Sequence, residues 1–567
     1  MSISAETAKL NQDKPAVVCC LTKKGTALQA SDLEDPSIFE DLIDSGLMQL
    51  TDNALTIGQA LGSTLTEDVD ALTPITPALV DGVPQAAIPA PPVKAEQSAA
   101  PQGVIRISVD ELKGLRLEIP AGAALPPFLP AAPAVPAPAE QPERIIRTLV
   151  QRDYFVKEVA VGDKTTFENG ALTIREGLCT DALKENELVV SLEMKIIRPE
   201  ERHVYSNSVM DVIPIAAKVE GILGEGVTNV ISGTVVVLTG LDEAGVQIHE
   251  FGSCEGYMDE KIRFGRPGCP DEDDIMICVN AVIRENTGME RRGPYAAHKA
   301  CDVVIQEIRD VLKAAPAASA TAVNEYHDYK KPGKPRVVLV KEIMGQGAMH
   351  DNVLLPTEPA GVKGGRQNVD LGNVPVVLSP NEVRDGGIHA LTCIGPATKE
   401  DTRHYFREPL VNLMALDDET NLVGVVFIGS PQVNDEKIFV AERLGSLIEA
   451  LDVDGAIVTT EGFGNNHIDF AENINQIGKR GIPVVGVSFC AYQGQLVVGN
   501  KYMDAMVELN KDPQGFENEI LGDSTICPKD AARALLMLKT KMAGIPIAPA
   551  DRKWSQDIID ANQRLVK

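Results

Sequence analysis

An alternation of short apolar runs and longer amphipathic segments after residue 335 constrains the fold more than any other feature of the sequence. Apolar runs typical of buried strands occur at 335–340, 374–379, 422–429, 455–460 and 482–489. Helical spacing lies between or after them, at 398–415, 435–451, 468–479 and 529–542. This alternation predicts an α/β domain over 335–550 with a mainly parallel sheet covered on both faces. Sites in such folds lie beyond the carboxyl ends of the strands.

The stretch before this domain is richer in strand signals than in helical ones. YFVKEVAVG and ALTIREG flank FENG, in which Asn169-Gly170 supplies the positive φ angles of a tight hairpin. Other strand candidates are LVVSLEMKII, VTNVISGTVVVLTG and DIMICVNAVI, and one helical pattern runs over 293–314. We therefore predict an α+β domain over 144–318 and a linker over 319–334, and we expect a tail over 551–567 after the α/β domain.

The N-terminal part is predicted to be a small unit on flexible tethers. In residues 1–73, AVVCCLT at 16–22 indicates a strand, and helical patterns follow at Ile38–Leu47 and Thr56–Leu61. Residues 74–143 are largely Ala/Pro-rich, which favours extended polyproline geometry. Within them, 103–119 has two alternating apolar runs that are too short to fold alone, so we expect this segment to dock on another surface.

The charge balance excludes several classes of partner. Lys plus Arg number 53 and Asp plus Glu number 81, which gives a formal net charge of −28. Such a chain repels nucleic acid and anionic lipid, so neither is expected as a partner. The sequence has neither an apolar signal core nor a run long enough for a membrane helix, which predicts a cytoplasmic protein with reduced thiols.

The ten cysteines indicate neither a metal site nor a dithiol motif. No C-x-x-C spacing occurs, which argues against a zinc ribbon and a thioredoxin-type pair. Cys254, Cys269 and Cys278 fit no familiar cluster spacing, so we expect ordinary thiols there and no metal. An electron relay at Cys19-Cys20 is an alternative to two side chains that alternate across a strand, which the run VVCCLT favours.

The segment from Asp385 to Leu410 is dense in reactive groups. Glycines and Pro396 allow sharp turns around Thr392-Cys393. From the residues alone, the favoured interpretation of Cys393 is an inert core thiol, because that is the common fate of a cysteine in apolar company.

A family resemblance favours the reactive interpretation. HALTCIGPATKEDTRHYFREPL, with YFVKEVAVGDKTTFENGALTI, KVEGILGEGVTNVISGTVVVLTG and DVDGAIVTTEGFGN, resembles the pyruvoyl-forming proproteins of the amino-acid reductases. These enzymes act on D-proline, glycine, sarcosine or betaine. The likeness covers about 144–545 and recurs in the N-terminal unit, where AVVCC, ASDLEDP and DLIDSGL favour the D-proline branch, as does LTC at the junction.

The resemblance implies self-cleavage between Thr392 and Cys393. The thiol attacks the Thr392 carbonyl to give a thioester, β-elimination follows, and hydrolysis leaves a pyruvoyl group, the implied cofactor, at position 393. A free thiol ionises only near pH ~8.5, so a base or a strained carbonyl must assist. His389 and His404 are candidates for that base, and a surface or capping role is the alternative for each. Cleavage would give fragments of 392 and 175 residues.

The pyruvoyl ketone is an electrophile that ordinary side chains do not offer. By resemblance, it binds the amine of D-proline and a selenolate opens the ring to give 5-aminovalerate. Lys399, Arg403 and Arg407 recur every four residues, so on a helix they share a face that could bind the substrate carboxylate. Arg403 is the preferred partner because guanidinium binds carboxylate bidentately, and a solvated face is the alternative.

Two further segments are expected to border the site. EGFGNNH at 461–467 follows a predicted strand, where Glu461 could shuttle protons and helix amides could bind an anion; a simple turn is the alternative. GQGAMH at 345–350 follows the first strand of the α/β domain.

The chain contains no selenocysteine, so the reducing nucleophile must come from a partner. The resemblance implies a hetero-oligomer with a smaller selenocysteine-containing subunit and an electron-donating reductase. Two alternatives stay open: a sister reductase that acts on glycine, sarcosine or betaine, and a scaffold that never cleaves and only docks the selenoprotein.

Overall fold

The structure is a computed structural model in which the chain divides into two compact units, Met1–Ala137 and Pro138–Lys567. The residues that it describes are 5–19, 22–34, 36, 39, 48, 50–51, 53–69, 72–81, 106–110, 114–118, 142–185, 187–248, 254–288, 292–343, 353–356, 373–391, 408–431, 433–460, 465–490, 498–547, 560 and 564. The finer domain boundaries expected at 318 and 335 stay predictions.

The first unit has short elements around a small apolar core. These are α1 (Ala5–Leu10), the 3-10 helix η1 (Ala30–Asp32), α3 (Ile57–Ala60) and the paired strands β1 (Thr64–Leu65) and β2 (Val80–Asp81). The expected strand at 16–22 is wrong over its described residues, because Val17, Val18 and Thr22 form isolated bridges to three different segments. The expected helix Thr56–Leu61 is confirmed in shorter form as α3, with Thr56 as its N-cap.

Other expectations for this unit fall largely outside the described residues. These are the helix at Ile38–Leu47, Cys20 of the cysteine pair, and the Ala/Pro-rich tethers at 84–102 and 120–142, of which only residue 142 is described. Within 103–119, β3 (Arg106–Asp110) pairs antiparallel with β4 (Gly114–Glu118), so the two apolar runs form a hairpin. Docking of this hairpin on another surface stays a prediction.

The second unit begins with two mixed four-stranded sheets and a smaller three-stranded one. The strand orders are β11-β14-β16-β9, β12-β13-β5-β17 and β6-β8-β7. Their bounds are β5 (Arg144–Phe155), β6 (Glu158–Gly162), β7 (Thr166–Glu168), β8 (Ala171–Arg175), β9 (Val189–Ile197), β11 (Ser208–Ile213), β12 (Ala216–Glu220), β13 (Gly226–Ser232), β14 (Thr234–Asp242), β16 (Ile275–Ile283) and β17 (Ala322–Lys330). The predicted hairpin is confirmed: Asn169 and Gly170 have φ of 54° and 83° between β7 and β8.

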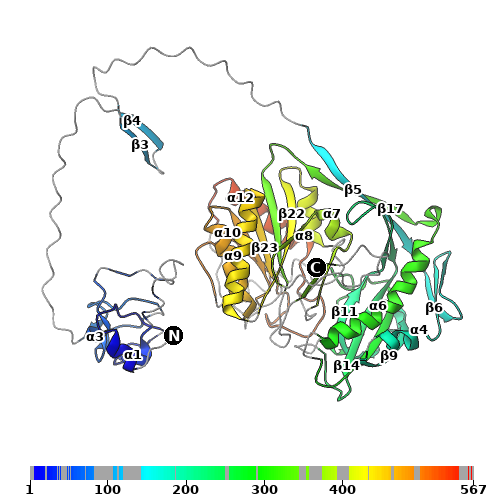
Figure 1. Cartoon of the computed structure of the whole chain (residues 1–567), viewed down its shortest axis with the longest axis horizontal. Coiled ribbons are helices and arrows are strands. Elements are labelled where there is room, and N and C mark those ends of the chain that lie inside the picture. Colours follow the sequence, from blue (N-terminus) through cyan, green and yellow to red (C-terminus); the bar gives the residue numbers. More distant parts are fainter. Residues whose placement is uncertain are drawn as a thin grey trace, which may run out of the picture. The chain divides into compact units, whose positions relative to one another are not determined.

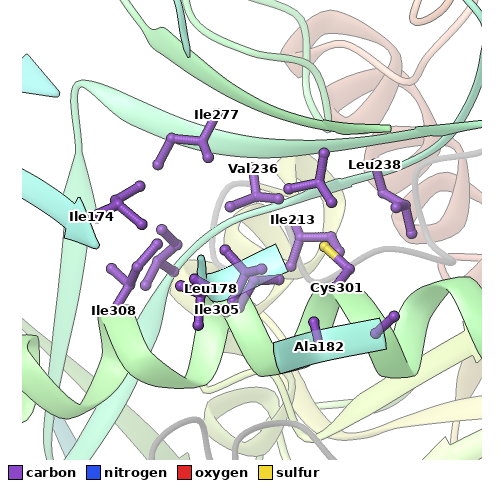
Figure 2. Close-up of a cluster of buried hydrophobic side chains, with 14 of the residues drawn as sticks. Ile174, Leu178, Ala182, Ile213, Val236, Leu238, Ile277, Cys301, Ile305 and Ile308 are labelled. Atoms are coloured by element: carbon purple, nitrogen blue, oxygen red, sulfur yellow. The ribbon is translucent and has the colours of Figure 1, made fainter. Parts of the chain in front are cut away.

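One long helix, α6 (Arg292–Lys313), packs against strands of both four-stranded sheets, which confirms the helix predicted at 293–314. Figure 2 shows Cys301, Ile305 and Ile308 of this helix facing apolar side chains of the sheet, among them Ile277 and Leu238. The other short elements here are α4 (Leu178–Ala182), η3 (Leu183–Glu185), η4 (Pro199–Glu201), β10 (Tyr205–Ser206), β15 (Gly256–Tyr257), α5 (Met258–Lys261) and η6 (Ala317–Ser319).

A six-stranded sheet of order β20-β22-β18-β23-β24-β25 forms the last part of the second unit (Figure 1). Its strands are β18 (Arg336–Ile343), β20 (Val376–Leu378), β22 (Asn421–Gly429), β23 (Gly455–Thr460), β24 (Val484–Ser488) and β25 (Met506–Glu508). All neighbouring pairs are parallel except β20 and β22. The predicted, mainly parallel sheet is therefore confirmed.

Helices cover both faces of this sheet, because its strands are apolar on both sides. Buried side chains of α9 (Asn434–Leu451) and α10 (Asn465–Gly478) pack on one face with Val338, Val340 and Val458. Those of α8 (Pro409–Leu416) and α12 (Pro528–Met542) pack on the other with Val337 and Leu339. The short helix α7 (Pro380–Arg384) and the ribbon of β19 (Val353–Pro356) and β21 (Ile388–Leu391) complete the elements.

The helix expected over 398–415 is confirmed for 409–415, but its continuity is wrong at Glu408. Helix α8 starts at Pro409, and Glu408 before it is an N-cap with extended backbone, at φ −68° and ψ 119°. A residue that precedes proline is pushed out of the helical region, and proline itself favours the first helical position. Glu408 therefore interrupts the expected helix, and residues 398–407 of that prediction lie outside the described residues.

Candidate active site

The order of the parallel strands places a topological switch point between β18 and β23. The chain passes from β18 to β22 on one side, and from β23 to β24 and β25 on the other. Crevices form at such points because the connections leave the two strands in opposite directions. The candidate site is therefore the carboxyl edge of the sheet, where β18, β22, β23 and β24 end at Ile343, Gly429, Thr460 and Ser488.

One buried polar cluster lies on the α9 and α10 side of this edge. The Glu342 carboxylate accepts from Thr460 Oγ1 at 3.0 Å and from Asn473 Nδ2 at 2.8 Å, and the Glu342 side chain is fully buried. Lys437 forms a short ion pair with Asp469, and Ser430 Oγ donates to the same Asp469 oxygen at 2.6 Å. The end of β18 and the N-terminal parts of α9 and α10 thus place two carboxyl groups and an ammonium group in one buried cluster.

Burial shifts the protonation of both carboxyls in this cluster. It raises the pKa of Glu342 well above its ordinary value, and nearby Asp469 adds to that shift. Burial also raises the pKa of Asp469 to about 6, although Lys437 opposes the change. Asp469 Oδ1 and Asn473 Oδ1 are buried and have no hydrogen-bond partner among the residues that the structure describes. Perturbed acids at the end of parallel strands are typical of functional sites.

A second cluster joins the ends of β24 and β25. His467 Nε2 lies 3.1 Å from Ser488 Oγ and 3.7 Å from Cys490 Sγ. The backbone N–H of Cys490 donates to Glu508 Oε1 at 3.0 Å, and Asn510 N–H donates to the same atom at 2.8 Å. A thiol, an imidazole and a carboxyl therefore meet at this edge.

Burial shifts the pKa values of His467 and Glu508 in the directions that favour the neutral form of each group. Burial lowers the pKa of His467 to about 4, so the imidazole is neutral at pH 7. Burial raises the pKa of Glu508 to about 7, against the N–H groups of Asn510 and Cys490. Glu508 is therefore divided between its acid and its base form near neutral pH, which suits proton transfer.

The segment that contains Thr392-Cys393 is flanked by well-defined residues. Upstream, β21 ends at Leu391, which lies opposite Val353 in the ribbon with β19. Downstream, the Glu408 carboxylate caps α8 by accepting from Val411 N–H, and it pairs with buried Lys341 of β18 at 3.0 Å. The backbone downstream of the segment is thus fixed beside the carboxyl end of β18.

Most site residues expected from the sequence lie outside the described residues. These are Thr392, Cys393, Lys399, Arg403, His404, Arg407, Glu461 and the GQGAMH stretch at 345–350. His389 is described as a backbone position of β21, opposite Leu355. The roles assigned to all of them stay predictions. Glu461 directly follows Thr460, and residues 345–350 come soon after Ile343, so both follow strands at the carboxyl edge.

No sequence pattern had drawn attention to the three acids or the lysine of these two clusters. Glu342, Lys437, Asp469 and Glu508 received no role, although Lys341-Glu342 at the end of the apolar run RVVLV was a usable signal. Burying two charged side chains in a strand costs free energy unless each of them has an ionic or hydrogen-bonding partner. His467 and Cys490 are distant in sequence, and only the order of β23 and β24 brings them together.

Neither a metal centre nor a membrane helix is found in the part of the chain that the structure describes. No three His, Cys, Asp or Glu side chains there converge in a way that could hold a metal ion. Likewise, none of the described helices combines the length and the apolar character that crossing a bilayer requires.

Comparison with known proteins identifies relatives along the whole chain. The family of glycine/sarcosine/betaine reductase component B subunits matches residues 148–509. The D-proline reductase proprotein PrdA of Acetoanaerobium sticklandii is 49% identical over 100% of this chain and 95% of its own length. No solved structure matches the chain.

More distant relatives share only part of the chain. The glycine reductase complex component B subunits alpha and beta of Acetoanaerobium sticklandii are 27% identical over 58% of this chain and 76% of their own length. The sarcosine reductase complex component B subunit alpha of Peptoclostridium acidaminophilum is 27% identical over 58% of this chain and 77% of its own length. The chain therefore belongs to the reductase component B family, as a relative of the D-proline reductase proprotein.

Proposed function

We propose that the chain is the proprotein of the pyruvoyl-bearing component of a D-proline reductase. The observation that carries this proposal is the 49% identity to a D-proline reductase proprotein over the whole chain. The glycine, sarcosine and betaine relatives are 25–27% identical over 58–63% of the chain, and the family match starts only at residue 148. The extra N-terminal unit therefore supports the D-proline branch over its sisters.

The proposed maturation uses the chain's own Cys393. Its thiol attacks the Thr392 carbonyl carbon, the peptide C–N bond breaks, and a thioester and a free amine form. Loss of the Cα proton then expels the thiocarboxylate of Thr392, and water replaces the nitrogen of the resulting dehydroalanine, releasing ammonia and leaving the pyruvoyl group. The anchors on both sides, at Leu391 and Glu408, support this scheme, because an attack of this kind needs a fixed carbonyl and thiol.

The pyruvoyl group would supply an electrophilic ketone for the substrate amine. The residues proposed around it are Arg403, helped by Lys399 and Arg407, as the seat of the substrate carboxylate, and His404 and Glu461 as proton carriers. Guanidinium suits a carboxylate because it binds both oxygens at once. Glu342, at the end of the strand that precedes 345–350, and Asp469, in α10 after Glu461, are buried acids with raised pKa values, which supports acid–base chemistry at this edge.

The described residues add one group to this set. Glu508, with its pKa near 7, is able to give and take a proton at the pH of a cell. His467, kept neutral by burial, and Ser488 hold the thiol of Cys490 beside it. We assign to this cluster the handling of protons at the β24–β25 end of the edge.

The proposed partners are a selenocysteine-containing subunit that supplies the nucleophile and a reductase that restores it. Several relatives carry names of reductase complex components, which supports a hetero-oligomer. The printed sequence contains no selenocysteine, in keeping with a nucleophile supplied from outside.

The test is a reconstituted assay. Matured chain, with the selenoprotein and a reductant, is expected to convert D-proline to 5-aminovalerate and to leave glycine, sarcosine and betaine untouched. Cys393→Ala is expected to abolish both cleavage and turnover, whereas Cys490→Ala should still be cleaved. Reduction of D-proline by the Cys393→Ala variant would refute the proposal.

A further inference from the structure

The backbone just before the cleavage segment is held by a different sheet from the one that carries the candidate site. Helix α7 and Asp385 at its C-cap lie between the six-stranded sheet and the sheet β12-β13-β5-β17. Asp385 is seven residues before Thr392, and β21 occupies 388–391 of the interval. Little free chain therefore separates Asp385 from the bond that is proposed to break.

Asp385 is bound by three donors from the β12–β13 hairpin. Its carboxylate forms a short ion pair with Lys218 Nζ, and it accepts from Thr228 Oγ1 at 2.6 Å and from Gly224 N–H at 2.9 Å. The Lys218 and Asp385 side chains are 2% and 0% exposed. A carboxylate that is buried among charge-assisted hydrogen bonds has very little freedom to move.

Adjacent Arg384 connects the two sides of the cleavage segment. Its Nε donates to Asn412 Oδ1 of α8 at 2.9 Å, and its carbonyl accepts from Gln151 Nε2 of β5 at 3.1 Å. Its guanidinium carbon also lies 5.0 Å from the centroid of the Tyr326 ring. Arg384 precedes residue 392 and Asn412 follows it, so this contact joins what would become two fragments.

These contacts would serve packing alone if no reaction depended on the position of residue 392. Self-cleavage does depend on it, because the thiol must approach the carbonyl within about 3 to 3.5 Å along a defined direction. We propose that Asp385, locked to Lys218 and Thr228, is a positioning residue for self-cleavage, so that the chain is cut only after the β12–β13 hairpin has folded against α7. This inference rests on the proposed cleavage at Thr392-Cys393.

The experiment follows cleavage of the full chain after synthesis in a cell-free system, with fragments resolved on denaturing gels over time. Asp385→Asn and Lys218→Met are expected to slow cleavage by about 10- to 100-fold. Thr228→Val removes one donor without leaving a buried charge unpaired, and we expect it to slow cleavage by a smaller factor. Lys218→Arg keeps the charge and is expected to restore most of the rate.

A second buried pair provides the matched control. Lys511 and Asp530 are 1% and 0% exposed with Nζ and Oδ2 2.8 Å apart, and they join α12 to the end of β25. Asp530→Asn is expected to lower the denaturation midpoint, as is Asp385→Asn, yet to cleave within about twofold of the wild-type rate, since Asp530 does not anchor the chain that leads to residue 392.

The outcomes separate the two proposals. If wild-type chain is never cleaved, the proposed function fails. If wild-type chain is cleaved and Asp385→Asn and Thr228→Val are cleaved equally fast, the positioning role fails while the proposed function stands. Equal slowing by Asp530→Asn would likewise overturn the positioning role, because it would reduce the effect to lost stability.

Discussion

The core around α6 and the carboxyl edge of the six-stranded sheet are both buried, but they are filled with different chemistry. Side chains such as Ile277, Leu238 and Ile305 fill the first (Figure 2). Glu342 and Asp469, with Lys437, occupy the second. Apolar burial stabilises a fold, whereas a buried ion pair is at best weakly stabilising compared with apolar packing. This difference is what we expect if the α6 core serves stability and the edge serves the proposed chemistry.

The largest effect is expected when denaturant pulls β18 out of the sheet, because this strand would hold the two cleavage fragments together. Cleavage after Thr392 would leave this strand in the larger fragment, hydrogen-bonded between β22 and β23 of the smaller one. The two fragments should therefore co-elute under native conditions and separate only in denaturant, as gel filtration before and after urea would reveal. Separation without denaturant would contradict this interlocked arrangement.

Breaking the Lys437–Asp469 pair should have the next largest effect. Asp469→Asn leaves a buried ammonium without a counter-charge, which typically costs about 3 to 5 kcal/mol of unfolding free energy. The double variant Lys437→Met/Asp469→Asn should recover part of that loss, since no charge then stays buried. Denaturant unfolding of the three proteins measures this. An unchanged midpoint in Asp469→Asn would show that the edge is not closed to water.

A cavity in the α6 core should lower stability without touching the edge. Ile305→Ala removes a side chain that is 0% exposed, and the expected loss is about 2 to 4 kcal/mol. Because the site is unchanged, turnover per folded molecule should stay at the wild-type value, which an activity assay normalised to folded protein would show. A lowered turnover would mean that the two regions are coupled.

The smallest effect is a pH-dependent one at Glu508. Its folded pKa is raised to about 7, so folding favours the protonated form, and this contribution to stability is lost as the pH rises through about 7. Glu508→Gln should therefore raise the unfolding free energy at pH 8 by roughly 2 kcal/mol and change it little at pH 4. Unfolding curves at the two pH values measure the difference, and an equal effect at both would contradict the raised pKa.

How much of this could be predicted from the sequence depends on how local each feature is. Apolar runs such as LVGVVFIG predict buried parallel strands because burial on both faces leaves no polar alternation, and the sheet confirms them. The hairpin at Asn169-Gly170 followed from local φ preferences. The helix predicted over 398–415 is interrupted at Glu408, because the residue before a proline is disfavoured in a helix. Pro409 was a usable boundary signal, but the prediction gave more weight to the helical periodicity.

The remainder could not be predicted because it depends on register and strand order. Val17 and Val18 look like a strand, yet their bridges go to different segments, so no ladder forms. The pairing of Lys218 with Asp385 spans 167 positions of sequence, and no local pattern marks it. Asp385 itself appeared only as the start of a reactive segment, although it is the anchor of that segment.

The mass and the N-terminal group of the smaller fragment from mature protein test the central claim most directly. The account predicts a 175-residue fragment that starts at position 393, resists Edman degradation and reacts with phenylhydrazine through its terminal ketone. An uncut chain of 567 residues, or a fragment that begins with an unmodified cysteine, would contradict it.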